Sequence, residues 1–344
     1  HLAFSLVSPP SRHQAVAILA QGQAFTCGGA CPSTMPLEDV WLKPLEEPCE
    51  DEKLRSHVVE LAEREGVRLF PEGEEQAAAR HFQDFGFVVL LDALKGDELT
   101  AQQRASAQLI REAERREPGG NRGRQRWSLG RTSAHEHLGR VCLEPADNGP
   151  VCSVLEHLWR SDRFTLLCSG GDFSLPGAAM QRMHADMSER HRAAERFTLP
   201  DMLAWPLPAT IKVYLTLVAF DEVTGPPVFV PGSHMRYVAE DVPEKDPVGS
   251  KYAYCPAGSA IIMDLRVWHH GSPNKSQIAR PMLSLHYAAP WYNENVLRQS
   301  NMYWIHHRGA LSRATLLGMR RPARRLCCNL VHQQCEQCSC PADC

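Results

Sequence analysis

The feature that most constrains this chain is a His-x-Asp motif, His184-Ala185-Asp186, followed far downstream by two adjacent histidines, His269 and His270. Residues two apart on a β-strand point to the same face, so one strand end can present His184 and Asp186 together. Two imidazoles and one carboxylate form the facial triad that binds non-haem Fe(II) and leaves coordination positions open. Neighbouring strand residues face opposite sides, so only one of His269 and His270 completes the set. Because the chain has 16 histidines, a chance His-x-Asp is the alternative.

The chain ahead of this motif alternates helical and strand patterns. Apolar residues at helical spacing predict helices over residues 51–67, 75–85, 94–114 and 154–160. Gly86 ends the second of these helices, and the β-branched run after it predicts a strand over residues 87–91. Helix, strand and helix therefore lead into the motif.

Beyond residue 164 the pattern changes to short strands. We expect them over residues 164–168, 211–220, 228–230, 260–263 and 281–288. Turns rich in glycine and proline separate them, and Ser169-Gly170-Gly171 is expected to end the first strand. The charged, proline-containing residues 190–208 indicate an insertion loop. Several short strands without helices between them favour a β-sandwich or barrel.

Five segments together resemble the phytanoyl-CoA dioxygenase family of Fe(II)/2-oxoglutarate-dependent oxygenases, and their order and spacing carry the resemblance. They are residues 82–94 (FQDFGFVVLLDAL), 184–186 (HAD), 223–234 (VTGPPVFVPGSH), 258–276 (GSAIIMDLRVWHHGSPNKS) and 280–287 (RPMLSLHY). The resemblance covers residues 75–291. It implies a fold that is mainly β with flanking helices, namely a double-stranded β-helix of the jelly-roll, cupin-like kind.

The resemblance also implies a choice between the two adjacent histidines. The family pattern places an Asn five residues after the distal ligand, and Asn274 stands at that distance from His269. We therefore expect His184, Asp186 and His269 as metal ligands, with His270 as the alternative. Asn274 is expected to fix the loop that follows His269.

The implied anchor for the far carboxylate of 2-oxoglutarate is Arg280, eleven residues after His269. A guanidinium offers that carboxylate a planar, bidentate fork. Some relatives carry a hydroxyl residue two positions after this arginine, where the present chain has Met282. We assign the remaining contacts to Tyr214 and Thr216, and packing within the strand is the alternative for each. Two further polar candidates are Lys212 and Ser284.

On this basis we expect a dioxygenase that converts 2-oxoglutarate and O2 into succinate and CO2 while it hydroxylates a small organic substrate. The implied metal is Fe(II), and ascorbate is left open as an accessory. Asp186 disfavours halogenation, because halogenating relatives replace this carboxylate with a small residue. Another oxidative outcome at the same site and a catalytically silent binding protein stay as alternatives. Residues 122–131 and 190–208 are the loops expected to gate the substrate.

Charge and apolar runs limit the partners. The formal net charge of −3 gives no reason to expect nucleic acid. No run approaches the roughly 18 apolar residues of a membrane span, which favours a soluble protein of the cytoplasm or an organelle. A basic cluster of Arg122, Arg124, Arg126 and Arg131 is either a solvated loop or a site for an anionic substrate. The oligomeric state is not indicated.

The composition along the chain predicts three regions. Residues 1–50 are rich in Ser, Pro, Gly and Ala, and we interpret them as a leader or a loosely ordered extension. Residues 51–310 form the expected oxygenase domain. Residues 311–344 form a Cys-rich C-terminal tail.

The cysteines gather near the two ends. Cys27 and Cys31 have the spacing of a weak ligand pair, and six of the 13 cysteines lie in the tail. There Cys335-x-x-Cys338 has the spacing of zinc ligands. Disulfides and a disordered, reactive tail are the alternatives to a zinc site.

Overall fold

The structure is a computed structural model that describes residues 37–48, 51–130, 132–186, 208–235, 242–291 and 326. The chain divides into two units, His1–Leu37 and Glu38–Cys344, and the architecture below belongs to the second. The predictions for Cys27 and Cys31, for the insertion at 190–208 and for the Cys-rich tail lie outside the described residues, apart from Pro208 and Leu326.

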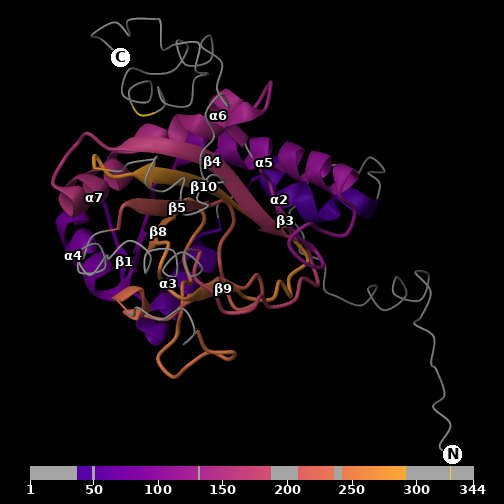
Figure 1. The fold of residues 1–344 in the computed structure, drawn as a ribbon. Coiled ribbons are helices and arrows are strands. Elements are labelled where there is room, and N and C mark those ends of the chain that lie inside the picture. Colours follow the sequence, from indigo (N-terminus) through magenta and orange to yellow (C-terminus); the bar gives the residue numbers. More distant parts are fainter. Residues whose placement is uncertain are drawn as a thin grey trace, which may run out of the picture. The chain divides into compact units, whose positions relative to one another are not determined.

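Two β-sheets form the centre of this unit (Figure 1). The seven-stranded sheet has the order β1-β2-β8-β5-β10-β4-β3, and the three-stranded sheet has the order β7-β6-β9. All described pairings are antiparallel except that of β1 with β2. The strands are β1 (Leu69–Phe70), β2 (Phe87–Leu90), β3 (Arg126–Ser128), β4 (Thr165–Ser174), β5 (Thr210–Thr216), β6 (Pro227–Phe229), β7 (Lys251–Tyr252), β8 (Ala260–Asp264), β9 (His269–Gly271) and β10 (Arg280–Ala288).

Helices supply the second layer. Figure 1 shows α5 and α6 on the side of the large sheet away from β9. The helices, including 3-10 turns marked η, are η2 (Leu37–Leu42), α2 (Lys43–Glu46), α3 (Glu52–Glu65), α4 (Glu75–Phe85), α5 (Gly96–Arg116), η3 (Thr132–Ala134), α6 (Gly139–Leu143), η4 (Glu144–Asp147), α7 (Gly149–Trp159) and η6 (Ser233–Met235). Within the described ranges, none of them is both long and apolar enough to cross a membrane.

Local sequence signals explain the helix ends. The Asp51 carboxylate accepts hydrogen bonds from the amides of Lys53 and Leu54 at 3.0 and 3.1 Å, so it caps α3. Gly86 ends α4 with a left-handed φ of 81°, a conformation that glycine adopts without strain. These helices and α5 confirm the predictions. The last predicted helix begins earlier, because the Asn148 side chain accepts a hydrogen bond from the Val151 amide and caps α7.

The two faces of the large sheet have different roles. Tyr287 of β10 points toward the helices, where its hydroxyl donates to the Ala146 carbonyl in η4 at 2.9 Å. On the opposite face, Phe87 of β2 stacks on Phe229 of β6 with ring centroids 4.4 Å apart. The interior therefore lies between the two sheets. The fold is the double-stranded β-helix with flanking helices that was predicted, and the sheets do not close into a continuous barrel.

One predicted turn is wrong. Ser169-Gly170-Gly171 does not end a strand but lies in the middle of β4, paired with Leu285, Ser284 and Leu283 of β10. A Cβ on Gly171 would lie 2.7 Å from the Met282 carbonyl oxygen. Glycine here therefore permits a close approach of neighbouring strands, a use that sequence alone does not separate from a turn.

The core extends beyond the predicted domain boundary at residue 51. Leu42 and Leu45, in and beside α2, are fully buried in the same hydrophobic cluster as the sheet. The Arg111 guanidinium of α5 binds the Glu46 carboxylate with an N–O distance of 2.5 Å. Leu326, from the predicted tail, also belongs to this cluster. The segment around α2 is therefore an integral part of the fold.

The described cysteines are structural. Cys142, Cys152, Cys168 and Cys255 form no disulfide, and all but Cys152 are buried. Burial raises the pKa of the Cys142 and Cys255 thiols to about 12. Since the thiolate is the reactive form, these two side chains act as small apolar core residues.

We predict that Leu45→Ala destabilises the oxygenase unit by about 2–5 kcal/mol, because it removes a fully buried side chain. Val40→Ala is the matched control, since Val40 is 57% exposed, and its effect should stay within about 0.5 kcal/mol. Urea denaturation of the two variants measures both values. Equal stability of the two would place α2 outside the folding unit.

Candidate metal centre

A single antiparallel bridge joins the two distant segments that carry the predicted ligands. The His184 amide donates to the His269 carbonyl at 3.0 Å, and the His269 amide donates to the His184 carbonyl at 2.8 Å. This reciprocal pairing brings the two imidazoles to a centroid distance of 4.5 Å. His184, Asp186 and His269 thereby place one ligand atom each within 4.8 Å of one another.

Both imidazoles are oriented by the backbone. Nδ1 of His184 lies 2.9 Å from the Arg182 carbonyl oxygen, and Nδ1 of His269 lies 3.0 Å from the Val267 carbonyl oxygen. A carbonyl only accepts hydrogen bonds, so each Nδ1 carries a proton, and in the neutral ring Nε2 is the atom that keeps a free lone pair. The two Nε2 atoms lie 3.7 and 3.9 Å from Oδ1 of Asp186. Two imidazoles and a carboxylate thus face one point, which fits a divalent metal.

Charge at this cluster favours the forms that bind metal. Burial alone would raise the pKa of Asp186, but the Lys212 ammonium, then His269 and His184, hold that pKa well below its usual range. Burial lowers the pKa of His269 to about 4 against the opposing charge of Asp186. At neutral pH the carboxylate is therefore ionised and the imidazole is neutral, as a metal requires. The cluster opens on one side, since the His184 side chain is 39% exposed and that of His269 only 8%.

The adjacent histidine has a different partner. His270 points to the other side of β9, and its Nε2 lies 2.7 Å from Oδ1 of Asp246. The Tyr252 hydroxyl donates to the second Asp246 oxygen at 3.2 Å. The structure therefore brings His269, and not His270, to Asp186. His234 is likewise engaged elsewhere, because it is buried with Nε2 3.0 Å from the Gln83 carbonyl oxygen.

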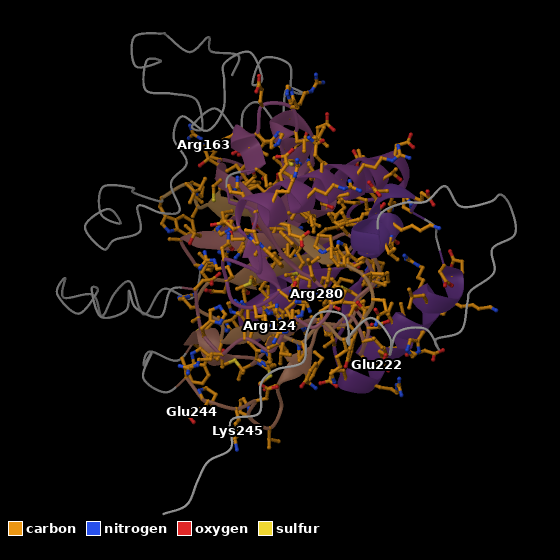
Figure 2. The ribbon with its side chains drawn as sticks, turned by 90° about the vertical axis from the view of Figure 1, so that its right-hand side faces the viewer. Arg124, Arg163, Glu222, Glu244, Lys245 and Arg280 are labelled. Carbon is orange, nitrogen blue, oxygen red and sulfur yellow. The ribbon has the colours of Figure 1, made fainter. Side chains whose placement is uncertain are left out.

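A row of polar residues crosses three neighbouring strands on the face that looks into the interior. Arg126 of β3 is paired with Ser174 of β4, and Ser174 is paired with Arg280 of β10. Residues paired directly across antiparallel strands share one face of the sheet. Arg280 is almost fully buried, and Figure 2 shows it among the packed side chains of the interior.

Backbone carbonyls hold one side of each guanidinium in this row. Nη1 of Arg280 donates to the carbonyls of Thr224 at 3.1 Å and Ser272 at 3.3 Å, and also to that of Gly225. Nη2 of Arg126 donates to the same Ser272 carbonyl. Burial, and then the nearby Arg126, lower the pKa of Arg280 to about 9. Burial likewise lowers the pKa of Arg126 to about 10.

Several polar atoms around this row lack partners. Nε of Arg280, Oγ of Ser174 and Oγ of Ser272 are buried and make no hydrogen bond within the described part of the chain. Buried polar atoms are normally satisfied, and an unsatisfied cluster costs stability. A carboxylate offers the acceptors that such donors lack. The row therefore fits the far end of 2-oxoglutarate.

The other predicted contacts differ from one another. The Tyr214 hydroxyl faces the interior and donates to Asp172 at 3.4 Å. The Thr216 hydroxyl donates to the backbone carbonyls of Pro256 and Ser259 at 3.0 and 3.2 Å. Its single proton is thus engaged with the loop before β8, which disfavours a contact from Thr216 to a carboxylate. The Ser174 hydroxyl lies in the same row, and sequence reasoning did not single it out because the register of β4 against β10 was unknown.

Asn274 fastens the loop that follows β9. Its side-chain amide donates to the carbonyls of Ser174 at 3.1 Å and Ile278 at 3.0 Å, and its oxygen accepts from the Ser276 amide. One buried side chain thus ties the loop to the end of β4, beside the unsatisfied Ser174 hydroxyl. This geometry accounts for an Asn at this distance from His269.

The basic cluster predicted from the sequence is split by the fold. Arg126 is buried in the interior, whereas Arg122 and Arg124 are exposed, and Arg131 lies outside the described residues. Arg122 lines a separate cavity of about 660 Å³ between the end of α5 and the loop after it. The cluster is therefore neither one solvated loop nor one anion site.

A double-stranded β-helix that brings two imidazoles and a carboxylate to a common point is the arrangement of a non-haem metal enzyme. A model of the family described as phytanoyl-CoA dioxygenase (PhyH) matches residues 82–282, more than half of the 344 residues. The chain belongs to the phytanoyl-CoA dioxygenase family, as predicted. Fe(II) and 2-oxoglutarate are accordingly its metal and its cosubstrate.

Three solved structures are similar to this chain. The α-ketoglutarate-dependent epimerase SnoN from nogalamycin biosynthesis is 15% identical with a TM-score of 0.47, over 62% of this chain and 80% of SnoN. The carbocyclase SnoK from the same biosynthesis is 19% identical with a TM-score of 0.44, over 65% of this chain and 89% of SnoK. EctD from S. alaskensis is 20% identical with a TM-score of 0.46, over 61% of this chain and 75% of EctD. Likeness at this level says nothing of substrate or reaction.

We predict that His269→Ala abolishes Fe(II) binding, whereas His270→Gln leaves it within about threefold of wild type. The reason is that His270 bonds to Asp246 on the far side of β9, and Gln keeps a donor for that carboxylate. Anaerobic Fe(II) titration monitored by tryptophan fluorescence measures both affinities. Loss of binding in His270→Gln with binding kept in His269→Ala would reverse the assignment.

Proposed function

We propose that this protein is an Fe(II)- and 2-oxoglutarate-dependent dioxygenase that hydroxylates a small organic substrate, with His184, Asp186 and His269 as the metal ligands. The observation that carries the proposal is the convergence of the Nε2 atoms of His184 and His269 on Oδ1 of Asp186. Three ligands on one side of a metal leave its remaining positions for cosubstrate and oxygen. Bound there, Fe(II) supplies the activation of O2 that is coupled to decarboxylation of 2-oxoglutarate into succinate and CO2.

The buried charges of the interior support the assignment of the cosubstrate anchor. Arg126 and Arg280 contribute two positive charges beside a single described carboxylate, Asp172, whose charge acts on both guanidiniums. A buried charge without a partner is costly, so the excess positive charge favours an anionic ligand. The far carboxylate of 2-oxoglutarate has the required charge, and Nε of Arg280 and Oγ of Ser174 are free to donate to it.

The apolar side chains around the cluster give it a dry inner wall. Phe229 stacks on Phe87 and lies 5.9 Å from the His269 ring, centroid to centroid. Met263 is fully buried and is paired with both Phe87 and Lys212 across the sheet. Exclusion of water strengthens the charge interactions at the site and protects reactive species from side reactions. The half-exposed side of His184 is then the side from which a substrate approaches.

Hydroxylation is favoured over the alternatives by the residues that are present. Asp186 is paired and ionised, so the position that a halide would need is taken by a carboxylate. Two imidazoles whose rings are oriented by backbone carbonyls favour a metal-dependent enzyme over a catalytically silent binding protein. A zinc site in the Cys-rich tail falls outside the described residues. A screen of a metabolite extract for compounds that stimulate succinate release would identify the substrate class. Mass spectrometry of the reaction should then find a product with one added oxygen atom.

We predict that the protein loaded with Fe(II) converts 2-oxoglutarate slowly into succinate without a prime substrate, and that Asp186→Ala abolishes this turnover. Loss of the carboxylate removes the anionic ligand of the described cluster. Asp246→Asn is the matched control and should keep the wild-type rate, since Asp246 bonds to His270 instead. Succinate release is the measurement. Equal rates in Asp186→Ala and wild type would remove the metal assignment.

We also predict that Arg280→Lys raises the KM for 2-oxoglutarate roughly 10- to 100-fold, because it loses about 1.5–3 kcal/mol of charge-assisted hydrogen bonding. Ser174→Ala should raise this KM about fivefold, through loss of one neutral hydrogen bond of about 1 kcal/mol. The Fe(II) affinity of both variants should be that of wild type. An unchanged KM in both variants would move the anchor away from this row.

A further inference from the structure

Lys212 occupies a place that the ligand set and the anchor row leave unexplained. Its side chain extends from β5 into the interior, where it is 11% exposed, and its Nζ lies 3.3 Å from Oδ2 of Asp186. The same Nζ lies 4.5 Å from the centroid of the Tyr214 ring. An ammonium group is expensive to bury without a carboxylate partner. The position of Lys212 is therefore tied to Asp186.

The two oxygens of Asp186 have different environments. Oδ1 faces the His184 and His269 Nε2 atoms at 3.7 and 3.9 Å, whereas Oδ2 faces the Lys212 ammonium. A free carboxylate binds a metal through one oxygen or through both. A hydrogen bond to one oxygen favours binding through the other alone. The arrangement thus separates a metal-facing oxygen from a lysine-facing oxygen.

We propose that Lys212 is a positioning residue that holds the second oxygen of Asp186 away from the metal, so that a coordination position stays open for 2-oxoglutarate. The inference rests on the proposed function and adds a role for a residue outside the ligand set. Partners that orient a ligating carboxylate are in general nearly as important as the ligand itself. In this arrangement Lys212 affects cosubstrate binding more than metal binding.

The surroundings of Lys212 restrict where its ammonium group can go. Lys212 is paired with Met263 of β8 on one side and with His286 of β10 on the other. The Tyr214 ring, two residues along the same strand face, lies beside the ammonium group in a cation–π contact. A long, flexible side chain is thereby limited to the direction of Asp186. Burial would lower the pKa of Lys212, but the charge of Asp186 raises it, so the lysine stays charged.

The test compares Lys212→Met with Lys212→Arg in two anaerobic titrations. Fe(II) is added first and monitored by tryptophan fluorescence. 2-Oxoglutarate is then added to the Fe(II)-loaded protein and monitored by the visible absorption that its chelation of Fe(II) produces. We expect Lys212→Met to bind Fe(II) at least as tightly as wild type, because a repelling positive charge is gone. Its Kd for 2-oxoglutarate should rise roughly 10- to 100-fold, and Lys212→Arg should restore most of the loss.

The control is Lys251→Met. The Lys251 amine donates to the Glu65 carbonyl at 2.5 Å, and this contact lies outside the metal cluster. The control variant should leave both affinities unchanged. An unchanged Kd for 2-oxoglutarate in Lys212→Met would overturn the role of Lys212 alone. A parallel loss of both affinities that Lys212→Arg does not restore would reduce Lys212 to a structural role and also overturn it. A wild-type chain that binds Fe(II) but never 2-oxoglutarate would refute the proposed function and this role with it.

Discussion

The structure of the site depends on one reciprocal pair of backbone hydrogen bonds, between His184 and His269. The segment around His184 belongs to no named strand, so this bridge, together with the hydrogen bonds between Gln181 and Gly271, sets its position against β9. Strand geometry then sets the directions of the neighbouring side chains. Asp186, two residues after His184, points toward the two imidazoles, whereas His270, one residue after His269, points away from them toward Asp246. A shift of one residue in this pairing would exchange the ligand for its neighbour.

The second organising constraint is the burial of charge between the sheets. Asp186 is neutralised by Lys212, whereas Arg126 and Arg280 are held by backbone carbonyls and exceed the single described carboxylate beside them. The charge of Asp186 is thus balanced within the chain, whereas the positive charge of Arg126 and Arg280 is balanced only when an anion binds. This contrast distinguishes the charge-paired cluster around Asp186 from the row around Arg280, the proposed cosubstrate anchor, whose buried donors are unsatisfied. The helices cover the other face of the large sheet, so the candidate site residues lie on the face that looks toward the small sheet.

Sequence patterns predicted most elements because helices and short strands carry their own periodicity and caps. Asn148 was missed as the cap that starts α7, and Gly170-Gly171 was taken for a turn although it allows β4 and β10 to approach closely. Both errors concern residues with two physical uses. An Asn caps helices or occupies turns, and a glycine forms turns or permits close backbone contact. Only the neighbouring strand or helix selects between those uses.

The sequence by itself determined the family, through segments in a fixed order, and that resemblance favoured His269 over its neighbour as the proposed third ligand. Tertiary structure alone decided the residues that surround the proposed ligands. Arg126 and Ser174 stand beside Arg280, and Lys212 meets Asp186, only because particular strands pair in a particular register. Such contacts join residues far apart in the chain, and no local pattern specifies which strand lies next to which. For the same reason Thr216, which alternation places on the inner face, gives its proton to the loop before β8 instead.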